Sequence, residues 1–149
     1  MIDDNLQGDL LYAYAAGIID GEGSIGLNRI TGEKRRARYT MRVVIGITDP
    51  YLPLFFQESF GGNIWVEKKQ NPKHKDCWFW CLSAKKAVPF LTEILPYLHI
   101  KRPQAELALR WQARKKLRHT PLTDREMALE EADRILMLSY NRRGKEETQ

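Results

Sequence analysis

Two carboxylates, Asp20 and Glu22, stand one residue apart where a predicted helix runs into glycines. The surrounding segment, residues 13–26, reads AYAAGIIDGEGSIG, an apolar run followed by an abrupt turn. The C-terminal end of a helix carries a partial negative charge, which favours cations and disfavours anions. Two acids in this place therefore predict a cation nearby that offsets them. The alternative is an ordinary core helix that ends in a glycine cap and continues into a strand.

The helix that carries these carboxylates also has small residues at three- and four-residue spacings. Residues at such spacings share one face. A face without bulk lets a second backbone approach closely, which a soluble helix seldom needs unless two helices pack tightly along their length. We therefore expect a helix–helix interface formed by Ala13, Ala16, Gly17 and Asp20.

The rest of the chain supplies the elements that position this segment. Hydrophobic periodicity and turn residues predict, in order, a helix over 8–20, strands over 24–30 and 37–47, a helix over 50–60, strands over 63–69 and 77–83, and helices over 84–97, 103–118 and 124–140. The clearest strand alternates two faces, one with Tyr39, Met41, Val43 and Ile45, the other with Arg38, Thr40, Arg42 and Val44. We expect an α+β fold in which both hairpins join one antiparallel sheet with helices on one face.

Size and composition fit one globular domain. The chain has 149 residues, of which 43% are hydrophobic and 29% charged. We expect a core over about 8–118, a C-terminal helix over about 124–140 and a disordered tail over 141–149. No apolar run approaches the ~20 residues that cross a bilayer, and no secretory leader is visible. We therefore expect an intracellular protein, in a prokaryotic cytoplasm or an organelle, without a membrane partner or a small-molecule substrate.

Positive charge is concentrated in one stretch. The net charge is +5 and the isoelectric point about 9.3. Residues 29–43 include six basic residues and the single acid Glu33. The basic residues are Arg29, Lys34, Arg35, Arg36, Arg38 and Arg42. A local basic excess of this kind favours a polyanionic partner such as nucleic acid.

The segment AAGIIDGEG, residues 15–23, resembles the LAGLIDADG signature of homing endonucleases. Five residues match the signature letter for letter: Ala16, Gly17, Ile19, Asp20 and Gly23. Ile18, Gly21 and Glu22 are substitutions that the family tolerates, and Ala15 is a mild departure from the leading Leu. The segment PYLHIKRPQA, residues 96–105, also resembles the family's segment after the second hairpin. The resemblance covers roughly residues 10–111.

This resemblance implies an αββαββα domain whose four-stranded sheet forms a saddle over DNA. Members with one motif pair two chains through the signature helices, so it implies a homodimer. Glu22 aligns with the family's metal-binding carboxylate, Gly21 with the neighbouring carbonyl ligand, and Lys101 with its active-site lysine. We expect Mg²⁺ or Mn²⁺ as cofactor, with Ca²⁺ supporting binding without cleavage. The family's glutamine near the end of the second strand has no counterpart within residues 47–49.

The resemblance implies a role for the basic residues on the strands, because a two-stranded antiparallel ribbon fits the major groove of DNA. Strand arginines suit guanine edges, and lysines in turns suit phosphates. Trp80 has two readings, a DNA contact or a core residue, of which we take the first. The expected DNA contacts are Asn28, Arg29, Arg36, Arg38, Thr40 and Arg42 in the first hairpin, and Lys68, Gln70, Lys73, Lys75 and Trp80 in the second. The alternative is a solvated sheet face whose charges keep it soluble.

These features together predict an intron-encoded homing endonuclease. It would bind a long, near-palindromic duplex DNA site as a homodimer and hydrolyse one phosphodiester in each strand with divalent metal. The alternative is a non-catalytic intron RNA maturase or a DNA-binding regulator on the same fold, which the absent glutamine favours and the retained Glu22 and Lys101 oppose.

Overall fold

The computed structural model describes residues 7–32, 35–115 and 121–146. The predicted order of helices and strands is confirmed in these ranges. The elements are α1 (Asp9–Glu22), β1 (Gly23–Gly32), β2 (Arg35–Ile47), α2 (Tyr51–Phe60), β3 (Asn63–Glu67), β4 (Cys77–Ser83), the short 3-10 helix η1 (Ala84–Lys86), α3 (Ala87–Ile94), η2 (Leu95–Tyr97), α4 (Arg102–Ala113) and α5 (Asp124–Glu146). None of the helices in the described part of the chain combines the length and apolar character that a membrane span requires.

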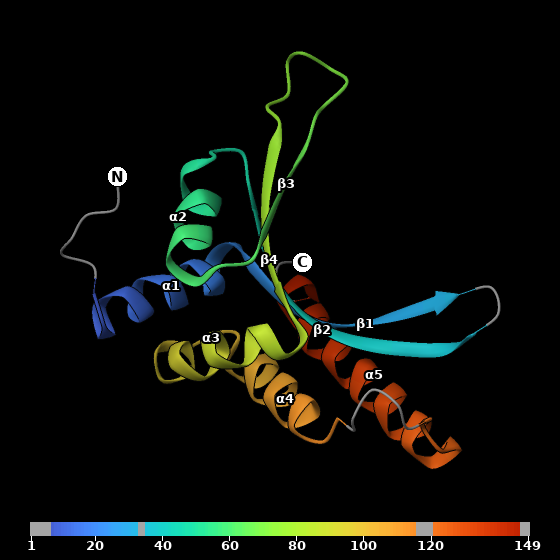
Figure 1. The fold of residues 1–149 in the computed structure, drawn as a ribbon. Coiled ribbons are helices and arrows are strands. Elements are labelled where there is room, and N and C mark those ends of the chain that lie inside the picture. Colours follow the sequence, from blue (N-terminus) through green and yellow to red (C-terminus); the bar gives the residue numbers. More distant parts are fainter. Residues whose placement is uncertain (1–6, 33–34, 116–120, 147–149) are drawn as a thin grey trace.

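The four strands form one antiparallel sheet in the order β1-β2-β4-β3. The β1–β2 and β3–β4 hairpins extend in different directions, and the helices gather on one side of the sheet (Figure 1). The opposite side, which we call the open face, carries no helix among the described residues. The predicted α+β architecture is therefore confirmed.

Alternation along the strands separates the two faces. In β2, Tyr39, Met41, Val43 and Ile45 are at most 4% exposed and pack under the helices. The residues between them point to the open face, since successive side chains of a strand point to opposite sides. The face assignment made from the sequence for β2 is thus confirmed.

An aromatic cluster fills the core between α2, α3 and β4. The fully buried Trp80 ring meets Phe56 edge-on at 4.9 Å between ring centroids and Phe90 at 5.3 Å. Its indole Nε1 donates a hydrogen bond of 2.7 Å to the carbonyl of Gly61, just after α2. Gly62 follows with a φ of +99°, and a Cβ there would lie 2.6 Å from the Cys81 carbonyl. The glycine pair therefore lets the chain turn tightly over Trp80.

Helix α1 begins at Asp9, one residue later than expected, with Gly8 at the cap position. The charge of Asp9 favours the positive end of the helix. At the other end of the chain, α5 continues to Glu146, so most of the tail predicted to be disordered is helical.

Helix α5 braces the β1–β2 hairpin from the covered side (Figure 1). The Tyr39 hydroxyl donates a 2.7 Å hydrogen bond to Glu131, which also accepts two hydrogen bonds from Arg134. Asn141 donates to the carbonyl of Ile25 at 3.1 Å. The bonds from Arg134 and Tyr39 lower the pKa of Glu131 from 4.5 to about 2. This brace holds the hairpin against the helical layer.

The first prediction concerns the indole of Trp80. Trp80→Phe removes the donor to Gly61 and should lower the free energy of unfolding, measured by urea denaturation, by about 1–3 kcal/mol more than Trp111→Phe. Trp111 is the matched control because it is equally buried, at 2% exposed, and its Nε1 has no hydrogen-bond partner among the described residues. Equal losses in the two variants would show that the hydrogen bond contributes nothing.

The second prediction follows from the low pKa of Glu131. Because the unfolded chain takes up the proton near 4.5 and the fold only near 2, Glu131 stabilises the protein above pH 4.5, and this contribution disappears as the pH falls toward 2. Urea denaturation at several pH values should show Glu131→Gln less stable than the wild type at neutral pH, with the gap closing toward pH 2. The exposed Glu93→Gln is the control. A gap that stays constant with pH would contradict the assignment.

Candidate active site and nucleic-acid interface

The carboxylates identified in the sequence end helix α1. Asp20, Gly21 and Glu22 are its last three residues, and β1 starts at Gly23. A Cβ at Gly23 would lie 2.8 Å from the backbone of Ile19. Only glycine therefore lets the strand leave the helix so abruptly, and this turn fixes Glu22 at the edge of the sheet.

Asp20 joins α1 to the segment that precedes α4. Its carboxylate accepts hydrogen bonds from the backbone N–H groups of His99 at 2.9 Å, Ile100 at 3.2 Å and Lys101 at 2.9 Å. Such groups at the N-terminal end of a helix favour an anion. Asp20 therefore ties the end of α1 to a loop that lies about 80 positions further along the chain.

Lys101 supplies a cation at the end of α1. Its Nζ donates a 2.9 Å hydrogen bond to the backbone carbonyl of Asp20. Burial lowers the pKa of Lys101 below its ordinary 10.5, while the negative charges of Asp20 and Glu22 oppose that shift. The two residues that the sequence assigned to catalysis, Glu22 and Lys101, are therefore brought together across 79 positions of the chain.

The oxygen donors at this site fit part of a metal site. Glu22 and Gly21 are exposed, and a carboxylate and a backbone carbonyl are ligands that Mg²⁺ or Ca²⁺ prefers. In the described ranges, no group of three or more His, Cys, Asp or Glu side chains is placed to hold a metal ion. The Asp20 carboxylate already accepts hydrogen bonds from the backbone N–H groups of residues 99–101.

The end of β2 reaches the same edge of the sheet. Ile45 pairs with Gly23, so Thr48 follows shortly after the position opposite the helix end. The Asp49 carboxylate accepts a 2.8 Å hydrogen bond from the backbone N–H of Tyr51 at the start of α2. The Asp49 carboxylate is therefore engaged in a local turn just before α2.

The outward face of α1 differs from the predicted interface. Ala16 is fully buried in this chain's own core beside Ile19, so its assignment to a helix–helix interface is wrong. Adjacent helical residues lie about 100° apart, and Ala16 and Gly17 therefore fall on different sides. The Asp20 carboxylate is hydrogen-bonded to the loop described above. Gly17 and, in part, Ala13 are exposed, beside Leu10 at 65% and Tyr14 at 38%.

The open face carries most of the polar residues expected on the first hairpin. Asn28 pairs with Thr40, and alternation puts Arg38 and Arg42 on the same side. The assignment of Arg29 is corrected, since it follows Asn28 directly and points to the covered side, where its charge acts on Glu131. The side chain of Arg36 lies outside the described residues.

In the second hairpin, the expected contacts divide between turn and core. The turn over 68–76 exposes Lys68, Gln70, Lys73 and Lys75. Trp80 is not a DNA contact, because it is fully buried and its Nε1 is bonded to Gly61. Its neighbour Phe79 faces the open side and stacks on Trp65. Sequence reasoning missed this pair, although alternation in CWFWCLS requires neighbouring aromatics to point to opposite faces.

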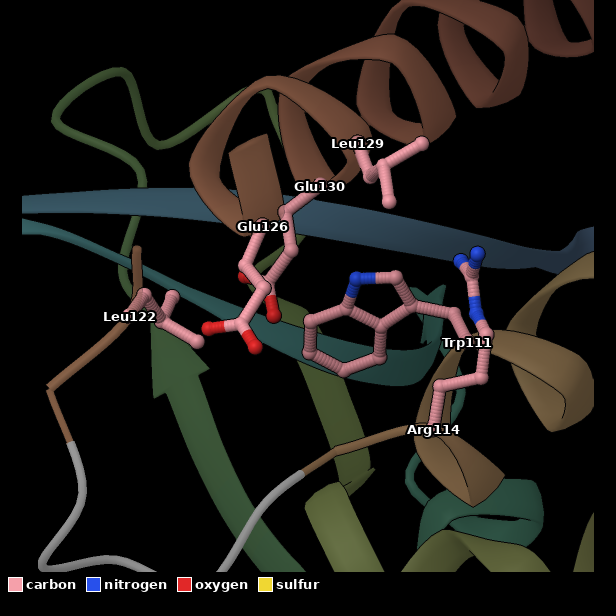
Figure 2. Close-up of a pocket in the computed structure, with 6 residues that line it drawn as sticks. All are labelled: Trp111, Arg114, Leu122, Glu126, Leu129 and Glu130. Atoms are coloured by element: carbon pink, nitrogen blue, oxygen red, sulfur yellow. The ribbon is translucent and has the colours of Figure 1, made fainter. Parts of the chain in front are cut away.

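A pocket between α4 and α5 lies away from these groups. Its lining residues are Trp111, Arg114, Leu122, Glu126, Leu129 and Glu130 (Figure 2). Burial raises the pKa of Glu130, which the charges of Lys115 and Arg114 oppose. The pocket is on the covered side of the sheet and belongs neither to the helix end nor to the open face.

No family model matches the chain. The chain is 30% identical over 120 residues to the DNA endonuclease I-CvuI of Chlorella vulgaris. The aligned region covers 78% of this chain and 71% of that protein.

Two solved structures share the fold. I-CvuI in complex with the I-CreI target, with 2 mM Mg and the DNA not cleaved, gives a TM-score of 0.62 at 24% identity over 73% of this chain and 69% of that one. The LAGLIDADG meganuclease I-CpaMI, bound to uncleaved DNA, gives 0.58 at 19% identity over 68% of this chain and 35% of that one. Taken with the 30% identity to I-CvuI and the signature at the end of α1, these matches show that the chain belongs to the LAGLIDADG homing endonuclease family.

Proposed function

We propose that this chain is a metal-dependent DNA endonuclease that cuts both strands of a long, near-palindromic duplex site as a homodimer. The observation that carries the proposal is the meeting of Glu22 with Lys101 at the edge of a sheet whose open face is polar and basic. I-CvuI, the relative with 30% identity, is a DNA endonuclease.

The open face would bind the duplex. A two-stranded ribbon enters the major groove, where Arg38 and Arg42 suit guanine and Asn28 suits adenine. The lysines of the 68–76 turn, on the far end of the second hairpin, suit phosphates. The two hairpins extend in different directions, and the β3–β4 hairpin projects beyond the helices (Figure 1). Together they could follow the groove over several base pairs.

The helix end would hold the reacting phosphate. Glu22 and the Gly21 carbonyl would bind a divalent ion such as Mg²⁺, which when bound supplies Lewis acidity and an activated water for phosphodiester hydrolysis. Lys101 is the chain's own cation at this point, and its ammonium would stabilise negative charge on the phosphate. Thr48 would position a water from the end of β2.

A second copy of the chain would complete the site. The outward face of α1 combines exposed apolar side chains, Leu10 and Tyr14, with the small residues Ala13 and Gly17. An apolar helical face of this kind is unfavourable when it is exposed to water. The small side chains on it allow another helix to approach closely. Pairing α1 with its symmetry mate would bring two Glu22 side chains together. Their mutual repulsion requires cations nearby.

The third prediction tests the role of Glu22. Glu22→Gln keeps the size of the side chain but removes the anionic metal ligand, so duplex binding should persist while double-strand cleavage with Mg²⁺ falls by a factor of about 10² or more. A duplex library built from the exon junction of the host intron provides substrates, and gel electrophoresis scores binding and cleavage separately. Glu93→Gln, on the exposed side of α3, is the matched control that should cut normally. Undiminished cutting by Glu22→Gln would defeat the assignment.

The same assay distinguishes the alternative function. A maturase or regulator would bind without cutting in the wild type at any Mg²⁺ or Mn²⁺ concentration. Preference for folded intron RNA over duplex DNA would identify the maturase.

The fourth prediction concerns Gly17. A Cβ at Gly17 meets no described atom within 4 Å apart from the backbone of its own helix, so Gly17→Leu should leave the subunit folded. It should weaken dimerisation about tenfold or more, because the added side chain overpacks a close helix contact. Sedimentation equilibrium measures the dimer, and Gly17→Ala, with a single added methyl, is the graded control. A wild type that stays monomeric, or a Gly17→Leu dimer of normal strength, would contradict this interface.

A further inference from the structure

An aromatic pair lies on the open face, apart from the core aromatic cluster. Trp65 in β3 and Phe79 in β4 occupy paired positions, and their rings stack with centroids 5.1 Å apart and planes 8° apart. Both side chains are partly exposed. The pair therefore presents a flat apolar surface on the side of the sheet that no described helix covers.

Gly46 holds the Phe79 ring against the sheet. Gly46 in β2 is the partner of Phe79 in the register, and a Cβ at this position would lie 2.6 Å from the ring. Any other residue would lift the ring away from the backbone. Because Phe79 is confined between Gly46 and Trp65, the surface is formed before any ligand arrives, which lowers the entropy cost of binding.

Arg42 borders this surface with a cation. Its guanidinium carbon lies 5.8 Å from the centroid of the Trp65 ring, within the range of a cation–π contact. The contact holds a long side chain that would otherwise sample many rotamers. The open face thus has two halves, a polar one with Asn28, Arg38 and Thr40, and an aromatic one edged by Arg42.

The chemistry of the major groove decides what the aromatic half can recognise. The C5 methyl of thymine is the apolar group that bases present there, and aromatic side chains contact it favourably. We propose that Trp65 and Phe79 read thymine methyl groups, so that the aromatic half of the open face selects thymine in each half-site. This inference rests on the proposed binding of duplex DNA by the open face.

The experiment replaces thymine by deoxyuridine, which pairs identically but lacks the methyl. A site is first selected by the wild-type protein from a randomised duplex library in Ca²⁺. Each thymine of the selected site is then replaced in turn, and affinity is measured by fluorescence anisotropy. Loss of a buried methyl should weaken wild-type binding about fourfold at one or more positions per half-site.

Variants connect those positions to the aromatic pair. In Phe79→Thr and Trp65→Gln, the deoxyuridine penalty at these positions should disappear, while penalties elsewhere persist. Ile135→Gln is the matched control. Ile135 is 57% exposed and lies on α5, so the sheet separates it from the aromatic pair on the open face. This variant should keep the full wild-type pattern.

The outcomes separate this inference from the proposed function. Selection of a specific duplex without any methyl sensitivity overturns the thymine reading and leaves DNA binding intact. Retention of the penalties in both aromatic variants overturns it as well. Failure to enrich or bind any duplex overturns the proposed function together with this inference.

Discussion

The contact between the Asp20 carboxylate and three consecutive backbone N–H groups is the constraint on which the site depends. It ties the last turn of α1 to residues 99–101. In addition, the Nζ of Lys101 donates a hydrogen bond to the backbone carbonyl of Asp20. A carboxylate at a helix C-terminus is unfavourable by itself. Here the N–H groups before α4 and the Lys101 ammonium offset that cost. Glu22 and Lys101 are consequently fixed relative to each other by contacts within the single chain.

The second constraint is the division of the sheet into two faces. Covered positions such as Met41 and Ile25 are fully buried, whereas alternate positions remain free of helices. Helix α5 braces the hairpin through the covered side chain of Tyr39 and through the Ile25 carbonyl of the edge strand β1. The packing that stabilises the hairpin therefore uses the covered face. Under the proposed function, substitutions on the open face would change specificity at little cost to the core.

Much of this arrangement was readable in the sequence, and the limits have physical causes. The strand alternation of β2 and the signature at residues 15–23 predicted the covered face and the position of Glu22. Trp80 was misplaced because β4 carries aromatics on both faces, and composition cannot tell which set is buried. Ala16 was misplaced because small residues occur on both sides of α1, where the bulky Leu10 and Tyr14 face outward. The contact of Asp20 with residues 99–101 spans about 80 positions, and no local pattern reports it.

The charges at the end of α1 determine what happens when two such helix ends meet in the proposed dimer. Within one chain, the Asp20 charge is taken up by backbone N–H groups and the start of α4, and Lys101 faces Glu22. The backbone N–H groups stabilise the Asp20 charge without removing it, so each helix end has two carboxylates against the one ammonium of Lys101, and two such ends side by side would repel. A phosphate approaching each Glu22 would add negative charge that the two lysines cannot neutralise. Under the proposed function, divalent cations would offset both the repulsion between the helix ends and the charge of the phosphates.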